Sequence, residues 1–165
     1  MLPTLLCFSA VTSQFHSPID IKVLETDFDR VAGIDWKGSL TYLDYSSKKP
    51  VEIKSTLYVK RALNQPSSWM WNVGYTDEPD HNSGDLLSLR FKGQFINDEK
   101  VIDRVVLGSG DVKITTEYKG DDDGKPALNR HVYVLGGKEI SLQKLVKFQS
   151  DKSFFERHIY RWKRS

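Results

Sequence analysis

Residues 128–148 decide the fold class; they read Leu-Asn-Arg-His-Val-Tyr-Val-Leu-Gly-Gly-Lys-Glu-Ile-Ser-Leu-Gln-Lys-Leu-Val-Lys-Phe. Apolar and polar side chains alternate in both arms of this stretch. In the second arm, one face carries Ile140, Leu142 and Val146, and the other carries Glu139, Gln143 and Lys147. A period of two is typical of a β-strand with one buried face. Gly136 and Gly137 can both adopt positive φ, so they predict a two-residue hairpin turn between two antiparallel strands.

The same pattern continues on both sides of this hairpin, from Gly38 to the C-terminus. Short alternating segments are separated by turn residues such as Gly108-Ser-Gly110 and Gly120–Pro126. Connections this short join only antiparallel neighbours, because a parallel crossover needs a dozen or more residues. The nine predicted strands are 39–45, 51–61, 69–76, 86–91, 100–107, 112–119, 128–135, 139–148 and 154–163. Sequential hairpins at this spacing indicate an all-β fold: an antiparallel up-and-down meander barrel of about 8–10 strands, with a two-sheet sandwich as the alternative.

A short N-terminal helix is predicted over residues 24–33. Thr26 or Asp27 can cap its start, and Gly33 can end it. No later segment has a sustained helical period. The length of 165 residues fits one domain. We therefore predict a single β-barrel domain over residues 14–165, preceded by a possible signal-peptide remnant over residues 1–13.

The first 13 residues resemble the apolar region and small-residue end of a secretory signal. Val11 and Ser13 fit the positions before a cleavage site. However, no Lys or Arg follows Met1, and the apolar stretch is short, so an ordered first strand is the alternative. The pattern predicts a periplasmic or secreted protein, and otherwise a cytoplasmic one. No other stretch reaches the 18 or more apolar residues of a membrane helix, so no transmembrane segment is predicted.

The charge of the chain is nearly balanced. Its 24 basic and 22 acidic residues give a net charge of +2, and no basic domain points to nucleic acid. Basic residues crowd only at the C-terminus, where a solvated strand edge is the simpler interpretation. Cys7 is the single cysteine, which excludes an intrachain disulfide.

The segment Val31-Ala-Gly-Ile-Asp-Trp36-Lys-Gly-Ser-Leu-Thr-Tyr42 resembles the entry to a lipocalin-like (calycin) barrel. In such barrels a Gly and a Trp precede the first strand, although here two residues separate Gly33 from Trp36. The resemblance, which extends to small exported bacterial barrels without an assigned role, implies that Trp36 closes one end of the barrel. It also implies that Arg157 or Arg161, near the end of the last strand, packs on this Trp.

A barrel of this kind implies a cavity for a small apolar or amphipathic molecule. Candidate lining residues come from alternate positions of the aromatic strands: Tyr42, Trp69, Trp71, Tyr75, Tyr133 and Tyr160, with Arg90 and Arg130 as candidate polar partners. A barrel filled by its own side chains, which would work as a structural or protein-interaction module, is the first alternative. A barrel enzyme of unknown chemistry is the second alternative. The sequence does not indicate an oligomeric state.

No catalytic, metal or cofactor site is predicted. The chain lacks a nucleophile elbow, a phosphate loop, a metalloprotease helix and a dinucleotide fingerprint. His131 and His158 lie in predicted strands, where histidines hydrogen-bonded within the sheet are the expected case. The acidic segment 121–126 lacks the ligand spacing of a calcium loop and is read as a hairpin tip.

Overall fold

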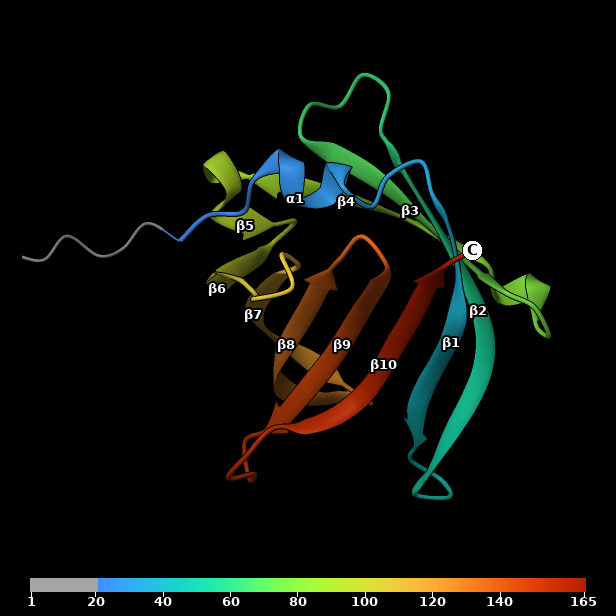
Figure 1. Ribbon diagram of the computed structural model, residues 1–165. Coiled ribbons are helices and arrows are strands. Elements are labelled where there is room, and N and C mark those ends of the chain that lie inside the picture. Colours follow the sequence, from blue (N-terminus) through green and yellow to red (C-terminus); the bar gives the residue numbers. More distant parts are fainter. Residues whose placement is uncertain (1–20) are drawn as a thin grey trace, which may run out of the picture.

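The computed structural model describes residues 21–165, and the arrangement is shown in Figure 1. The described chain contains a short α-helix, α1 (Glu25–Asp29), two 3₁₀ turns (Pro79–His81 and Phe91–Gly93) and ten strands. The strands are β1 (Asp35–Asp44), β2 (Lys49–Arg61), β3 (Ser68–Tyr75), β4 (Ser83–Arg90), β5 (Phe95–Ile96), β6 (Glu99–Val106), β7 (Val112–Asp122), β8 (Lys125–Leu135), β9 (Glu139–Phe148) and β10 (Phe155–Arg164).

The strands form one closed antiparallel barrel. Each strand pairs with its neighbours in sequence, and β1 closes the barrel by pairing with β10. The paired residues run from Trp36 opposite Arg164 to Tyr42 opposite His158. The prediction of an all-β up-and-down barrel with a short N-terminal helix is therefore confirmed. Because the first and last strands pair, the closed sheet has no exposed strand edge there. The fold is therefore the barrel and not the two-sheet sandwich.

One end of the barrel is filled by large rings. Trp36, Trp69, Trp162 and Phe28 are each at most 1% exposed, and we call them the tryptophan layer. Phe28 comes from α1, which lies across this end in Figure 1, and its ring packs 5.1 Å from that of Trp69. This is the closed end. The opposite end, which we call the mouth, carries the β1–β2, β7–β8 and β9–β10 turns.

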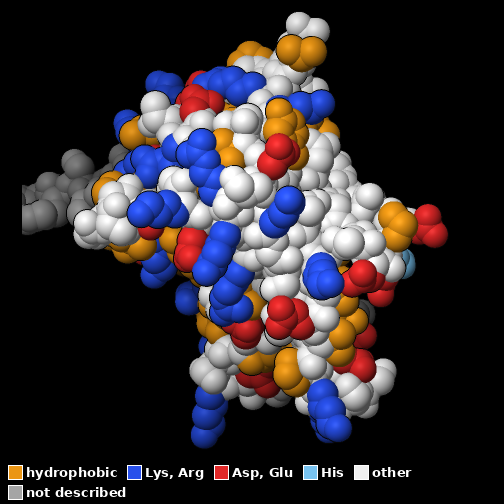
Figure 2. Space-filling model, turned by 45° about the vertical axis from the view of Figure 1, so that its right-hand side comes forward, with side chains coloured by type: hydrophobic (Ala, Val, Ile, Leu, Met, Phe, Trp, Pro, Cys, Tyr) orange, Lys and Arg blue, Asp and Glu red, His pale blue; other side chains and the backbone are white. Residues whose placement is uncertain are grey.

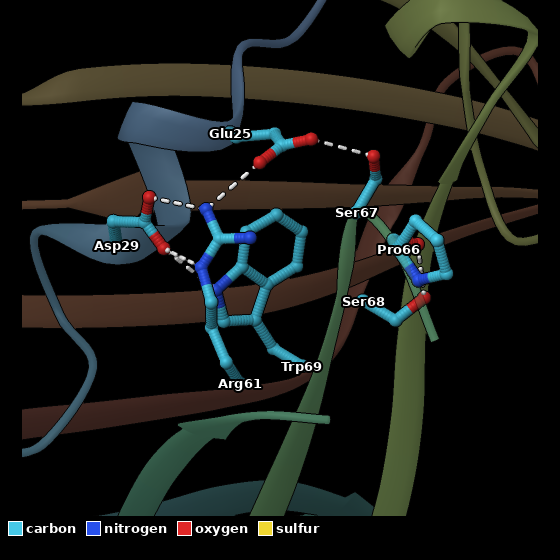
Figure 3. Close-up of polar contacts among 7 residues, drawn as sticks. All are labelled: Glu25, Asp29, Arg61, Pro66, Ser67, Ser68 and Trp69. Atoms are coloured by element: carbon cyan, nitrogen blue, oxygen red, sulfur yellow. Dashed lines mark hydrogen bonds and ion pairs between the residues drawn. The ribbon is translucent and has the colours of Figure 1, made fainter. Parts of the chain in front are cut away.

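Two arginines hold α1 against the barrel. Arg61 of β2 bonds the carboxylates of Glu25 and Asp29, and the Trp69 indole N–H donates to Asp29 at 3.1 Å (Figure 3). On the other side, Arg104 of β6 donates two hydrogen bonds to the buried carboxylate of Asp27, at 2.6 and 2.8 Å. The helix is thus fixed as a plug over the tryptophan layer.

The outer surface carries both signs of charge. In the view of Figure 2, Lys and Arg side chains lie among Asp and Glu side chains, with small hydrophobic areas between them. The polar residues of the alternating sequence pattern, such as Lys113 and Lys147, occupy the outward positions of the strands. No helix among residues 21–165 is long and apolar enough to cross a membrane.

Some local predictions differ from the structure. The Gly136–Gly137 turn is a three-residue loop, with neither glycine at positive φ, and the Gly136 N–H donates to the Glu139 carbonyl at 3.0 Å. Glycine is favoured at 136 because a Cβ there would lie 2.8 Å from the Glu139 backbone carbonyl oxygen, as well as 2.5 Å from the Asp111 carboxylate. The helix begins at Glu25, so Thr26 and Asp27 lie inside it; Asp27 instead accepts the Leu24 N–H at 2.8 Å.

The two-residue strand β5 is too short to leave a pattern in the sequence. The predicted signal-peptide remnant lies in residues outside the described part of the chain, so export stays a prediction.

Candidate functional site

A row of polar side chains crosses the inner face of five neighbouring strands. Tyr42 of β1 pairs with His158 of β10, His158 with Lys144 of β9, Lys144 with His131 of β8, and His131 with Thr116 of β7. We call these five residues the polar row. Directly opposed residues in an antiparallel sheet have Cβ atoms about 4.5–5.5 Å apart, so the row brings five polar groups from distant parts of the sequence together.

The polar row lies above an apolar floor. Two residues closer to the closed end, the paired positions are Leu40, Tyr160, Leu142, Tyr133 and Ile114. Two residues further, Trp162, Ile140, Leu135 and Val112 form the next pairs and belong to the fully buried core. One row of side chains therefore separates the polar row from the level of the tryptophan layer. At 3.2–3.4 Å per residue, the four residues from Lys144 to Ile140 span roughly 13 Å.

Glu99 joins the polar row from β6. Its carboxylate lies 2.9 Å from the His131 Nδ1 and accepts the Thr116 hydroxyl at 2.5 Å. The ring of Tyr118 stacks on the His131 imidazole, with centroids 5.8 Å apart. These contacts fix the orientation of His131 from two sides.

A second carboxylate, Asp122, lies nearer the mouth. It accepts the Lys144 ammonium at 2.7 Å and the Tyr45 hydroxyl at 2.5 Å, and the Arg157 guanidinium lies 3.5 Å away. Burial acts to raise the pKa of Asp122, but the hydrogen bonds from Lys144 and Tyr45 outweigh it and hold the pKa below its usual value. Asp122 is therefore an ionised counter-charge to Lys144 and Arg157. The contact from Tyr45 on the β1–β2 turn to Asp122 on β7 runs between strands that are not neighbours in the barrel.

His158 is neutral at neutral pH. Burial is the main cause that lowers its pKa to about 4; the positive charges of Lys144 and Arg157 lower it further, and the Asp122 carboxylate acts in the opposite direction. Within the described chain its imidazole makes a ring contact with Tyr160 and no hydrogen bond.

Asn129 is a buried amide without a hydrogen-bond partner. It is 0% exposed, and neither its Oδ1 nor its Nδ2 has a partner among the described residues. It lies on the same face of β8 as His131, one inward position nearer the mouth, and pairs with Tyr118 and Val146. The Trp71 indole N–H is also buried and unpartnered. Because buried polar groups are nearly always hydrogen-bonded, such groups point to a missing partner inside the barrel.

Solvent reaches the inner face around the polar row. The side chains of Lys144, His131 and Glu99 are 16%, 18% and 19% exposed. Leu142 and Tyr160 of the floor are also only partly buried, in contrast to the tryptophan layer. The polar row and the floor are therefore less tightly covered than the closed end of the barrel.

The predicted lining residues fall into three groups. Tyr42, Tyr75, Tyr133 and Tyr160 point into the interior, and the hydroxyls of Tyr75 and Tyr160 bond each other at 2.6 Å. Trp69 and Trp71 are buried in the core beneath α1, where Phe28 packs against both.

Arg90 and Arg130 lie elsewhere. Arg90 pairs with the exposed Asp98, and Arg130, next in sequence to the inward His131, pairs with Glu117 and stacks on Phe154. Their role in binding stays a prediction.

The residues expected to close the barrel are also separated. Trp36 is at the closed end, where its indole N–H donates to the Val31 carbonyl at 3.1 Å. Arg157 lies toward the mouth and contacts the Leu43 carbonyl and the Tyr45 ring. It is seven residues along β10 from Arg164, the partner of Trp36, a span of roughly 23 Å. Arg161 is exposed, opposite Ser39.

Sequence reasoning missed the residues that make the site polar: Lys144, Thr116, Glu99, Asn129 and Asp122. A signal was present for the first two. Lys144 interrupts the apolar face of Ile140, Leu142 and Val146, and Thr116 occupies the position between Ile114 and Tyr118. A polar residue at an inward position of a strand therefore marked this site.

The arrangement can bind polar atoms of a small molecule through hydrogen bonds and charge. Among residues 21–165, no group of three or more His, Cys, Asp or Glu side chains is placed to hold a metal ion. No protein-family model matches this chain, and no curated protein has a significantly similar sequence.

Proposed function

We propose that this protein is a lipocalin-like barrel that binds one small, compact amphipathic molecule in the half of the barrel that faces the mouth. The observation that carries the proposal is the inward polar row, in which Lys144 and His131 are partly exposed, above an apolar floor. Ligand sites in proteins combine apolar walls with a few placed polar groups, and this half of the barrel has both.

The depth of the site sets the size of the ligand. Only one row of side chains, which includes Leu142 and Tyr160, lies between the polar row and the level of the tryptophan layer. A long acyl chain would need the space that Trp36, Trp162 and Phe28 occupy. A compact ring system, lying on the floor with its polar group at the row, fits this depth.

The unpaired groups support a bound molecule over a barrel filled by its own side chains. A core that is complete without a ligand satisfies its buried polar atoms. Asn129, one inward position nearer the mouth than His131, is buried without partners, and leaving such a group unpaired costs about 1–3 kcal/mol. A polar ligand group bound there would recover part of this cost.

The neutral fluorescent probe prodan tests the proposal, because it is a compact naphthalene with a polar carbonyl. We expect saturable binding of one probe per protein, with a blue shift of its emission as it leaves water. Leu142→Trp fills the space above the floor and should weaken binding at least tenfold. Leu145→Trp is the matched control, since Leu145 faces outward on the same strand, opposite Arg130 and Glu156.

Circular dichroism and thermal unfolding establish that both variants keep the barrel. Binding that is absent in the wild type, or equally strong in both variants, contradicts a site inside the barrel.

A further inference from the structure

The hydrogen-bonding groups of the site differ in how fully they are used. Each oxygen of the two carboxylates already has a partner: both oxygens of Glu99 and both of Asp122 face donors from the protein. The donors are not all used. The Lys144 ammonium has three N–H groups, of which one is bonded to Asp122. The Asn129 amide N–H₂ is unbonded, and the His158 imidazole has no hydrogen-bond partner within residues 21–165.

These free donors lie on three successive strands, β10, β9 and β8. His158 is directly opposite Lys144, and Asn129 is the diagonal neighbour of Lys144 across the β8–β9 pair. Diagonal neighbours in an antiparallel sheet are about 7–8 Å apart, a gap that one small polar group can bridge. The unpaired acceptors among these side chains are the Asn129 Oδ1 and the unprotonated ring nitrogen of the neutral His158, which are fewer than the free N–H groups.

Two cations and one carboxylate lie around the same point. Lys144 and Arg157 lie near His158, and their shared counter-charge Asp122 also acts on the His158 imidazole. A group with two acceptor oxygens and a negative charge complements this arrangement, because charge-assisted hydrogen bonds are about twice as strong as neutral ones.

We infer that the ligand of the barrel carries a carboxylate, and that this group binds between Lys144, His158 and Asn129. The inference rests on the proposed function, since it concerns the same site. The carboxylate completes the hydrogen bonds of Asn129 and takes the spare N–H groups of Lys144. The ring of the ligand then lies toward Leu142 and Tyr160.

A pair of probes with one shape separates charge from size. Naphthoate and naphthamide share the ring, but only naphthoate has two acceptor oxygens and a negative charge. Isothermal titration calorimetry at neutral pH should show naphthoate binding at least tenfold more tightly than naphthamide, as expected for one or more hydrogen bonds between charged groups.

Two variants locate the preference. Lys144→Met removes the cation, and we expect the preference for naphthoate to fall to about the level of naphthamide. Asn129→Leu removes the amide without changing its shape, and we expect a roughly tenfold loss of naphthoate affinity. Because the amide is unpaired in the free protein, this second variant should unfold at a temperature no lower than the wild type. Lys147→Met, on the outer face of the same strand, is the control and should bind as the wild type does.

The outcomes distinguish the two proposals. Equal affinity for naphthoate and naphthamide, with prodan still bound, overturns the carboxylate inference alone. Wild-type preference retained in Lys144→Met also overturns it. Failure of prodan and both naphthyl compounds to bind overturns the proposed function as well.

Discussion

The imidazole of His158 faces the barrel interior between its two cross-strand partners, Tyr42 and Lys144. Burial and neighbouring positive charge lower its pKa to about 4, whereas the pKa of a histidine in an unfolded chain is about 6.5. Between these two values the unfolded chain binds more protons than the folded one. The stability that His158 contributes is therefore fully present above about pH 6.5 and is lost as the pH falls toward about 4.

We predict that replacing His158 with Gln flattens the pH dependence of stability. The free energy of unfolding of the wild type, measured in urea, should fall between about pH 6.5 and about pH 5 by up to roughly 1.4 kcal/mol per pH unit from this residue. His158→Gln should lose that part of the slope. His81 is exposed at the end of the 3₁₀ turn Pro79–His81, so His81→Gln should keep the slope of the wild type. An unchanged slope in His158→Gln would show that the imidazole is solvated in the folded state.

At the scale of elements, the attachment of α1 rests on two arginines that differ in burial. Arg104 pairs with Asp27, whose side chain is 1% exposed, whereas Arg61 and its partners Glu25 and Asp29 are 37–48% exposed. Removing one partner of a buried ion pair leaves an uncompensated charge, but an exposed pair is screened by water.

We therefore expect Arg104→Met to destabilise the protein far more than Arg61→Met. The expected costs are roughly 3–5 kcal/mol for Arg104→Met and about 1 kcal/mol or less for Arg61→Met. Both variants keep an apolar stem, so the comparison isolates the guanidinium. Urea denaturation followed by tryptophan fluorescence measures the two values. A loss in Arg61→Met that equals or exceeds the other would mean that the exposed network in Figure 3, and not the buried pair, holds the helix.

At the scale of the whole molecule, the barrel was predictable from the sequence because its signal is local. Alternation in segments such as Ile140–Phe148, with turn residues between segments, is enough to indicate sequential antiparallel hairpins. The ends of the strands were harder to predict from the sequence. Strand β4 begins at Ser83, in a stretch whose residues are typical of a loop, and it is a strand there because it pairs with β3 in the barrel.

The site was less predictable, because register across five strands creates it. Nothing in the sequence places Lys144 between His131 and His158, or brings Glu99 to Thr116. Only the fold separates the aromatic residues into two groups: Tyr160 lies in the floor of the site, while Trp69 belongs to the tryptophan layer beneath α1. That Asn129 is buried without a hydrogen-bond partner can be seen only in the folded structure.

The most direct test of the account is to locate bound prodan by nuclear magnetic resonance, using backbone amide shifts of the ¹⁵N-labelled protein during a titration. If the molecule binds above the floor of the barrel, the largest shifts should belong to Tyr42, Leu142, Lys144 and His158. A surface groove beside Phe148, lined by Pro126 and Gln149, offers an alternative place for an apolar probe. Shifts confined to that groove, with the four interior residues unchanged, would contradict the account.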